Sequence, residues 1–211
     1  MDLQPLIDAV IAGNANGAKA LAEAALAEDV APATIVNEGL IAAMGVVGER
    51  FGRGEIYVPE MLLSARAMTT ALAILEPLMS KSDVGSRGTV VIGTVKGDVH
   101  DIGKNIVAIM LKGSGFTVHD LGVDVPAERF VEAIKEHQPD VVGLSALLTT
   151  TMPGMRSVMD ALVAAGVRDE VKVLVGGAPV TEEFALSIGA DGYGKDAGEA
   201  AERAKQLILA S

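Results

Sequence analysis

The sequence lacks cysteine and tryptophan, and aromatic residues account for only 3% of its 211 residues. Without cysteine the chain can form no disulfide, no thiolate metal site and no cysteine nucleophile. Basic residues are also few: the chain has 17 of them and 28 acidic residues, which gives a net charge of −11. Such a charge repels phosphate backbones and anionic lipids, so neither nucleic acid nor a membrane is an expected partner.

Long hydrophobic runs are also missing. The longest charge-free stretch of the apolar N-terminal part, residues 39–48, is too short to span a bilayer and is expected to be a buried helix. A secretory signal starts with basic residues, whereas this sequence starts with the acidic Asp2. We therefore expect a cytoplasmic protein, long enough for one large domain or two small ones.

Residues 1–80 show helical periodicity and almost no alternation of β-branched residues. Apolar residues spaced along one face predict the first helix: Leu3, Leu6, Ile7, Val10 and Ile11. Three further helices are expected to begin near Asn14, Pro32 and Pro59, since asparagine caps helices and proline suits their first turn. Four short helices with brief connections predict a four-helix bundle.

A different pattern follows after a short polar segment. Residues 81–88 contain two glycines and no apolar periodicity, which predicts an interdomain linker. Beyond it, Val/Ile-rich runs predict strands at residues 89–95, 117–121, 141–144, 171–175 and 191–193. Helices are predicted between and after them at residues 103–111, 127–136, 155–165, 182–188 and 198–209. This alternation over residues 89–211 predicts an α/β domain with a flavodoxin-like (Rossmann-type) five-stranded parallel sheet.

Small and polar residues follow three of the predicted strands. The first strand is followed by Gly97, Asp98, Val99, His100, Asp101, Ile102 and Gly103, the third by Ser145, Ala146 and Leu147, and the fourth by Gly176 and Gly177. A loop histidine is most often a surface residue, and a Gly-Gly pair most often makes a tight turn. Because the carboxyl ends of strands one and three border the ligand crevice of this fold, their coincidence instead predicts one site.

The order and spacing of these groups resemble a known signature. Asp98-x-His100-x-x-Gly103, then Ser145-x-Leu147, then Gly176-Gly177 is similar to the cobalamin-binding pattern of methionine synthase, the B12-dependent mutases and small corrinoid proteins. Segment 51–62, with Phe51, Val58 and Met61, resembles the methyl-cap module of methionine synthase and the corrinoid proteins, which the mutases lack. The chain is thus identified as a member of the corrinoid protein group of methyltransferase systems.

The resemblance implies a cobamide cofactor (cobalamin or methylcobalamin, which contains cobalt) with His100 as its lower ligand. The cofactor's own base would be displaced by His100 (base-off/His-on), and its tail would lie beside the sheet. Asp98 and Thr151 would continue a hydrogen-bond chain from His100, although the family residue at the Thr151 position is serine. Further cofactor contacts are expected in two places: Gly97, Val99, Asp101, Ile102, Gly103, Ser145, Leu147, Thr149, Gly176, Gly177 and Ala197 in the α/β domain, and Phe51, Val58 and Met61 in the cap.

The residue types agree with this implication. Neutral imidazole is a good ligand for cobalt, and a metal-bound histidine usually donates its other N–H to a carboxylate. Asp98 is close enough in the loop to accept that hydrogen bond. A narrow slot for the cofactor's tail needs small residues, which Gly103, Ser145, Gly176 and Gly177 supply. No phosphate-binding Gly-x-x-x-x-Gly-Lys-Ser/Thr or Gly-x-Gly-x-x-Gly pattern occurs in the turn after the first strand.

As a corrinoid protein the chain would not be a catalyst on its own. Cobalt(I) would take a methyl group from a substrate held by a substrate:corrinoid methyltransferase. A methylcobamide:acceptor methyltransferase, using tetrahydrofolate or a thiol coenzyme, would then receive it, and a reductive activator would restore oxidised cobalt. Such systems serve anaerobic one-carbon metabolism. The partner selects the donor, so methanol, methylamines, glycine betaine and aryl methyl ethers all stay open, as does the oligomeric state.

Several alternatives remain at this point. A B12-dependent sensor would keep the same cofactor domain, but no DNA-binding module is visible and the missing tryptophan removes the cap motif of the photoreceptor relatives. The cap pattern disfavours a mutase subunit, and a flavodoxin-like protein with another cofactor would differ in colour. Residues 56–58 either cover a ligand or pack on the bundle, and Glu38 is a cofactor contact or an ordinary surface residue. His119 and His137 are not expected in the site.

Overall fold

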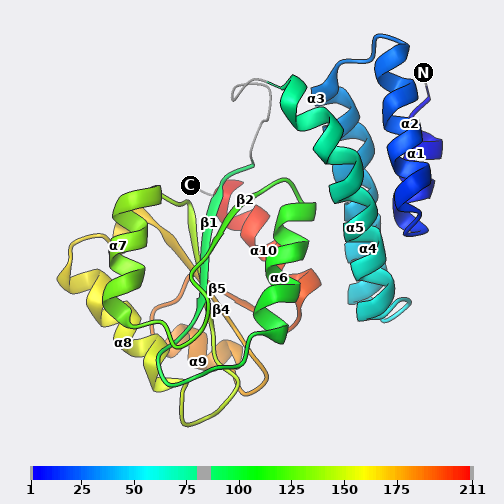
Figure 1. Cartoon of the computed structure of the whole chain (residues 1–211). Helices are drawn as coiled ribbons and strands as arrows, with labels where there is room; N and C mark the ends of the chain where they lie inside the picture. Colours follow the sequence, from blue (N-terminus) through cyan, green and yellow to red (C-terminus); the bar gives the residue numbers. More distant parts are fainter. Residues whose placement is uncertain (1, 80–86, 210–211) are drawn as a thin grey trace. The chain divides into compact units, whose positions relative to one another are not determined.

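Helices alone form the first of two compact units into which the chain divides, and alternating strands and helices form the second (Figure 1). The structure, a computed structural model, describes residues 2–79 and 87–209. The predicted linker at residues 81–88 lies almost entirely outside this described part, so the linker and the domain limits beside it stay predictions. The fold class, a helical region followed by a five-stranded α/β unit, is confirmed.

The helical unit contains the four predicted helices, one of which changes its winding. Its elements are α1 (Gln4–Ile11), α2 (Ala15–Ala27), α3 (Pro32–Thr34), η1 (Ile35–Ile41), α4 (Ala42–Gly52), α5 (Val58–Leu75) and η2 (Glu76–Leu78). The helix that begins at Pro32 runs through η1, which is π-helical, to Gly52. The side chain of Asn14 caps α2 by accepting a 2.9 Å hydrogen bond from Gly17 N, as its position predicts.

The longest helix, α5, is the centre of this unit. It packs against α1, α2 and α4, and the alanines on the buried face of α2 (Ala18, Ala22 and Ala25) leave room for its side chains. Ser64 Oγ donates to the last carbonyl of α1, at Ile11, over 3.1 Å. Within the described residues, one helical segment, Val58–Leu78, is long and apolar enough to cross a membrane by these two criteria. Its place in the bundle accounts for the same composition, because a core helix buries an apolar face.

The second unit is built around a parallel sheet with the strand order β2-β1-β3-β4-β5. The strands are β1 (Thr89–Thr94), β2 (Thr117–Asp120), β3 (Val141–Ser145), β4 (Lys172–Gly176) and β5 (Gly192–Gly194). The helices are α6 (Ile102–Gly113), α7 (Ala127–His137), α8 (Pro153–Ala164), α9 (Glu182–Ser187) and α10 (Ala197–Leu209), and η3 (Arg168–Glu170) precedes β4. Every predicted strand and helix of this unit is present, and no end differs from its prediction by more than two residues.

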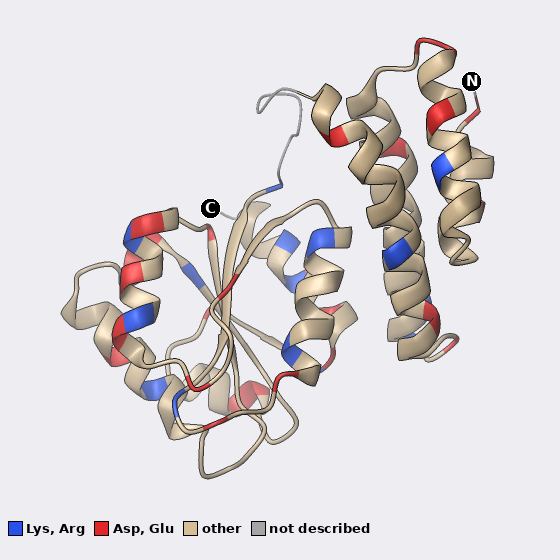
Figure 2. Ribbon diagram, in the orientation of Figure 1, with Lys and Arg blue, Asp and Glu red and all other residues tan. Residues whose placement is uncertain are grey.

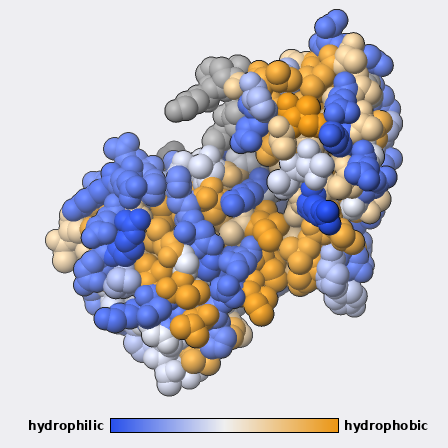
Figure 3. Space-filling view, in the orientation of Figure 1, coloured by the Kyte–Doolittle hydropathy of each residue, from blue (hydrophilic) through white to orange (hydrophobic). Residues whose placement is uncertain are grey.

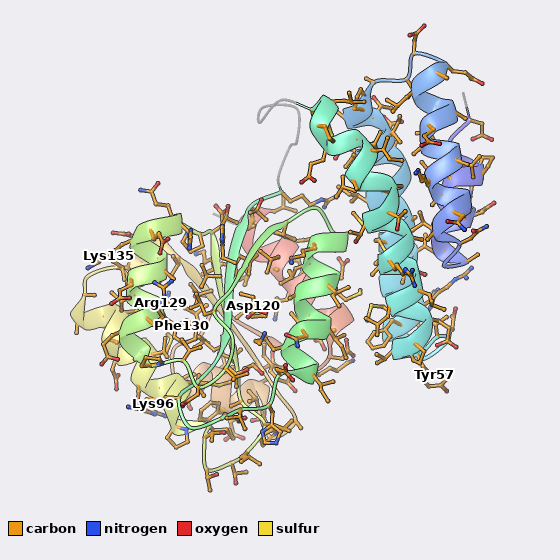
Figure 4. All side chains as sticks on the ribbon, in the orientation of Figure 1. Tyr57, Lys96, Asp120, Arg129, Phe130 and Lys135 are labelled. Carbon is orange, nitrogen blue, oxygen red and sulfur yellow. The ribbon has the colours of Figure 1, made fainter. Side chains whose placement is uncertain are left out.

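Helices cover both faces of the sheet, as Figure 1 shows. On one face, α7, α8 and α9 share a continuous apolar core with the strands, whose central side chains include Val91, Val142, Phe130 and Leu162. Phe130 lies on the sheet side of α7, whereas Arg129 of the same helix is partly exposed (Figure 4). A Cβ on Gly93 of β1 would lie 2.9 Å from the Phe130 ring, so the ring needs a glycine opposite it. This packing fixes the strands that carry the site.

The sheet places the predicted site residues at one edge. All strands are parallel, with β2 on one side of β1 and β3 on the other. The connections therefore change direction between β1 and β3, and this fold leaves a crevice beyond the carboxyl ends of these two strands. The strand register pairs Thr94 with Ser145, and Ser145 with Gly176, so the three strands end level with one another. The loops that follow them therefore meet. Basic and acidic residues are interspersed on α7 and form no continuous basic band in this view (Figure 2).

Candidate functional site

A carboxylate and an imidazole are joined in the loop between β1 and α6. Asp98 is 1% exposed, and its Oδ1 accepts hydrogen bonds from His100 N over 3.0 Å and from His100 Nδ1 over 2.7 Å. The His100 side chain is 45% exposed. Since an ionised carboxylate only accepts, the imidazole proton resides on Nδ1, and Nε2 keeps its lone pair. No hydrogen bond to Nε2 is present in the described part of the chain.

The second oxygen of the same carboxylate is held by the loop after β3. Asp98 Oδ2 accepts from Leu147 N over 2.7 Å and from Thr151 Oγ1 over 2.6 Å. Thr151 is itself buried, and its Oγ1 accepts from Leu148 N over 3.3 Å. The hydroxyl also lies 2.9 Å from the carbonyl oxygen of Leu148, but it has one proton to donate and the contact with Asp98 is shorter. The predicted chain from His100 through Asp98 to Thr151 is thus present in the geometry.

These hydrogen bonds determine the charge of Asp98. Burial raises the pKa of this carboxyl, but the hydrogen bonds from the Thr151 hydroxyl, from the backbone N–H groups of Leu147 and His100 and from the His100 ring outweigh it. The pKa of Asp98 is therefore held well below its usual range. The carboxylate is therefore ionised at neutral pH, and it fixes both the tautomer and the orientation of the imidazole.

The exposed imidazole is surrounded by exposed apolar side chains on the same and neighbouring loops. Val99, Ile102, Leu147 and Leu148 are between 42% and 76% exposed. Figure 3 shows hydrophobic surface among hydrophilic surface at the end of this unit where the strand-end loops lie. Apolar side chains gathered around a polar group are typical of a binding site for a large apolar ligand.

The described residues contain no group of three His, Cys, Asp or Glu side chains that could hold a metal ion. His100 could therefore contribute one ligand to a metal whose other ligands come from elsewhere. A metal held in a macrocycle meets this condition, because the ring supplies most of the coordination and the protein supplies an axial position. Histidines that ligate a metal commonly have a carboxylate behind them, as His100 has Asp98.

The predicted glycines have different surroundings. A Cβ on Gly177 would lie 1.9 Å from the carbonyl oxygen of Ala146, and one on Gly176 would lie 2.9 Å from that of Gly194. These two glycines thus allow the end of β4 to approach its neighbours closely. A Cβ on Gly103, in the first turn of α6, would meet no atom within 4 Å. Of the three, only Gly103 faces open space, where a ligand could lie.

The other predicted residues lie in the strand-end loops or nearby. Ser145 ends β3, and Gly97, Asp101 and Thr149 are exposed in the loops after β1 and β3. Ala197 is buried at the first position of α10. Contacts of these residues with a ligand stay predictions.

In the helical unit, the three predicted cap residues differ in exposure. Phe51 and Val58 are half-buried at the end of α4 and the start of α5, whereas Met61 is fully buried. Tyr57, which the sequence did not single out by itself, is 69% exposed at the N-cap of α5 (Figure 4). Its backbone N–H donates to Glu60 Oε2 over 3.1 Å, which fixes the start of the helix. The role of this segment toward a ligand stays a prediction.

The site also contains residues that the sequence did not reveal. Thr94 is fully buried and donates from Oγ1 to the carbonyl oxygen of His100 over 3.0 Å. Asp124, in the loop after β2, holds the backbone of Gly97 and Asp98. Backbone contacts of this kind leave little trace in a sequence. The one available signal is that aspartate is among the residues that tolerate a left-handed backbone, which Asp124 adopts with φ of 53°.

Comparison with known proteins identifies the family of the chain. Two family models, each described as a B12 binding domain, match residues 88–202 and residues 3–76. The chain is 48% identical over 207 residues to the dimethylamine corrinoid protein of Methanosarcina barkeri, which covers 98% of this chain and 97% of that protein. The chain belongs to the B12-binding domain family.

Other members of the family agree with this assignment along nearly the whole chain. The trimethylamine corrinoid protein of Methanosarcina barkeri is 48% identical over 193 residues, which are 90% of this chain and 89% of that protein. The crystal structure of the methanol:cobalamin methyltransferase complex of the same organism gives a TM-score of 0.89 at 32% identity, over 99% of this chain and 80% of that one. A cobalamin-binding protein of Desulfitobacterium hafniense gives a TM-score of 0.82 at 34% identity, over 98% of both chains.

The residues of the site fit the cofactor of the B12-binding family. An exposed imidazole with a free Nε2 suits a ligand position on cobalt, and the buried Asp98 holds the proton of the neutral ring on Nδ1. The exposed apolar side chains beside it suit the edge of a large ring. The remaining two histidines lie elsewhere, as predicted: His119 on β2 and His137 at the end of α7 stack with ring centroids 3.8 Å apart and planes 8° from parallel.

Proposed function

We propose that this chain is a corrinoid protein that binds a cobamide and carries a methyl group between methyltransferases. Its family is that of B12 binding domains, and its most similar relatives named above are corrinoid proteins of dimethylamine and trimethylamine systems. The observation that supports the proposal most directly is the Asp98–His100 pair at the edge of the sheet, with Nε2 of the imidazole free to bind a metal.

In this proposal His100 would hold the cobalt through Nε2, in place of the cofactor's own base. The cofactor supplies a cobalt centre that can accept a methyl group and give it up again. Asp98 holds the Nδ1 proton of His100, so that Nε2 presents its lone pair to the metal. Thr151 and Leu147 hold the carboxylate in turn, and both donate to the oxygen that His100 leaves free.

Asp98 and His100 can also hold a second proton while the imidazole is not bound to a metal. When His100 is not bound to a metal, its Nε2 would be free to take a proton from solvent, because the side chain is exposed. The resulting imidazolium is stabilised by Asp98, which stays ionised since its pKa is lowered. Apolar side chains around the ring, such as Val99 and Ile102, would meanwhile keep water from the cofactor's edge.

The partners of this carrier are proposed to be two methyltransferases and a reductive activator. One transferase would bring the methyl donor, and the other would pass the methyl group to tetrahydrofolate or a thiol coenzyme. Methylated amines are the first donors to test, because the relatives named for amines are 48% identical to the chain and the methanol complex is 32% identical. The place of action is proposed to be the cytoplasm.

Spectroscopy of the cobamide-loaded protein tests the ligand. In the cobalt(II) form, uniform ¹⁵N labelling of histidine should change the nitrogen hyperfine splitting in the electron paramagnetic resonance spectrum of wild type. His100→Ala should lose this dependence on the label while still holding cofactor, and His119→Ala, altered on β2, should retain it. Label-dependent splitting that persists in His100→Ala would refute lower ligation by this residue.

Methyl transfer tests the carrier role. The loaded and reduced protein should accept a methyl group when mixed with a methylamine:corrinoid methyltransferase and mono-, di- or trimethylamine, measured as the change in its visible spectrum. Transfer onward would be measured as the methylated thiol or folate. A protein that binds cobamide but accepts no methyl group from any amine, methanol or aryl methyl ether would contradict the proposed function.

A further inference from the structure

The backbone beneath the Asp98–His100 pair is gripped by Asp124. Asp124 N donates to the carbonyl oxygen of Asp98 over 2.9 Å, and Asp124 Oδ1 accepts from Gly97 N over 2.7 Å. One residue thereby holds two consecutive residues of the loop that ends in His100. The contact comes from the loop after β2, which lies on the opposite side of β1 from β3 and its loop.

The loop that carries Asp124 is itself held in register along β1. Pairing continues beyond the last residue of β2: Leu121 N donates to Ile92 O over 2.8 Å, and Thr94 N donates to Gly122 O over 3.0 Å. Val125 N then donates to Thr94 O over 3.0 Å, and Val95 and Val125 form an isolated parallel bridge. The loop is therefore an extension of the sheet, and Asp124 occupies a defined position at its end.

The backbone conformation at both ends of the grip is unusual. Asp124 has φ of 53° and Gly97 has φ of 85°, so both residues are left-handed. Left-handed backbone is unfavourable for residues other than glycine, and aspartate and asparagine tolerate it better than most. A non-glycine residue held in this conformation by hydrogen bonds from both its backbone and its side chain indicates a site where the surrounding structure determines the geometry.

The loops after β2 and β3 thus hold different parts of Asp98. Leu147 and Thr151, from the β3 side, hold its carboxylate, whereas Asp124, from the β2 side, holds its backbone. The position of the His100 ring depends on both, because its Nδ1 bonds to that carboxylate. Without the Asp124 carboxylate, Gly97 N would lose its partner, and the permissive glycine could rotate and carry Asp98 with it.

We propose that Asp124 is a positioning residue for His100, which acts through the Gly97–Asp98 backbone to keep the imidazole proton on Nδ1. The inference deepens the proposed function and rests on it for its relevance to cobalt. What Asp124 supplies is an acceptor oxygen at one point and a backbone that adopts the left-handed conformation. Asparagine supplies both, whereas glycine supplies only the conformation and alanine neither.

The test begins with protein free of cofactor. In wild type, ¹⁵N-labelled histidine should show His100 predominantly as the Nδ1–H tautomer, which is read from the separation of its two ring nitrogen shifts. Asp124→Asn should retain this signature. Asp124→Gly should increase the ratio of the Nε2–H to the Nδ1–H tautomer at least threefold, and Asp124→Ala should do the same where it folds.

Asp140→Gly is a matched control at the other end of the same strand. Asp140 grips β1 by the same pattern, since its N–H donates to Thr89 O over 2.9 Å and its Oδ2 accepts from Thr89 N over 2.7 Å. Asp140→Gly should lower the free energy of unfolding without moving the ring nitrogen signals of His100. The control thus separates a general loss of stability from a loss of positioning at His100.

Cobamide-loaded protein provides the second readout. The fraction of cobalt(II) with label-dependent histidine splitting should fall in Asp124→Gly and be restored in Asp124→Asn. Wild-type ring signals in Asp124→Gly, or their loss in Asp124→Asn, would overturn the inference. Because the first readout involves no cofactor, it can fail while His100 still proves to be the ligand, and the His100→Ala experiment can fail while the positioning effect stands.

Discussion

Thr151 and Asp98, which are 53 residues apart in the sequence, share a hydrogen bond of 2.6 Å at the edge of the sheet. The bond joins the loops that follow β3 and β1, and it is one of the two contacts that hold the carboxylate oxygen not used by His100. The orientation of the imidazole thus depends on a residue that lies on another loop.

Thr151→Val should lower stability and raise the pKa of Asp98. Valine has the shape of threonine without the hydroxyl, and a buried hydrogen bond to a charged group contributes about 1.5–3 kcal/mol. Urea denaturation of the cofactor-free protein measures the first effect, and a carbon-detected NMR titration of the Asp98 carboxyl measures the second. Thr151→Ser, which keeps the hydroxyl, should leave the pKa of Asp98 unchanged. A pKa that stays at the wild-type value in Thr151→Val would contradict the role of this bond.

Asp98→Asn should remove part of the sensitivity of the fold to acid. The pKa of Asp98 is lower in the folded protein than in the unfolded chain, where it is about 3.9. Asp98 therefore stabilises the fold above that pH, and this stabilisation is lost as the pH falls below it. The free energy of unfolding should fall less steeply between pH 5 and 3 in the variant than in wild type, and at pH 7 the variant should be less stable by about 2–3 kcal/mol.

The exposed Asp160 of α8 offers a control for this measurement. Asp160→Asn removes the same charge from the surface and should keep the slope of the wild-type protein. Equal slopes in wild type and Asp98→Asn would show that the acid sensitivity of the fold does not come from Asp98.

His119→Phe should reduce the loss of stability between pH 7.5 and 5. Burial lowers the pKa of His119, the neighbouring His137 lowers it further, and Glu136 acts in the opposite direction. The unfolded chain then takes up a proton near pH 6.5 that the folded protein resists, so stability decreases as the pH falls through that value. Phenylalanine keeps a flat ring against His137 without titrating. Urea midpoints measured at both pH values check this, and an unchanged difference would contradict it.

Gly177→Ala and Gly103→Ala should have opposite effects on fold and binding. The first change brings a Cβ to 1.9 Å from Ala146 O at a residue with φ of 133°, so it should destabilise the protein by more than about 3 kcal/mol. In Gly103→Ala the new Cβ would meet no atom within 4 Å, so the melting temperature should stay within a few degrees of wild type. If Gly103 lines the cofactor slot, its variant should bind cobamide more weakly by titration. Unchanged affinity would remove Gly103 from the slot.

The sequence predicts the elements of the α/β unit well because its signals there are local. Val/Ile runs mark the strands and amphipathic stretches mark the helices, and the pairing of His100 with Asp98 follows from their nearness in one loop. The sequence predicts less of the site geometry where backbone contacts between distant residues determine it. The bond from Leu147 N to Asp98 and the grip of Asp124 use main-chain groups that every residue has, so no residue type reveals them.

The helical unit shows the same limit. The start of its third helix at Pro32 could be predicted, but the π-helical winding of η1 could not, because apolar spacing along a helix does not indicate it. Met61 is one of the three cap residues expected to contact the cofactor, and the sequence does not indicate that its side chain is fully buried in the structure. Tyr57 is the exposed residue in the same segment, and only the geometry of the helix start distinguishes the two.

The convergence of three loops on Asp98 has a consequence for engineering. An insertion after β1, β2 or β3 would disturb the position of the His100 imidazole, so fluorescent tags or fusion partners are excluded from that edge. Among the described residues, the loops at the amino ends of the strands make no hydrogen bond with Asp98. Gly166, in the turn after α8, is exposed and has open space beside it, but its φ of 72° favours glycine, so an insertion there should follow this residue and keep it. A reporter placed there would lie away from the loops that hold Asp98 and His100.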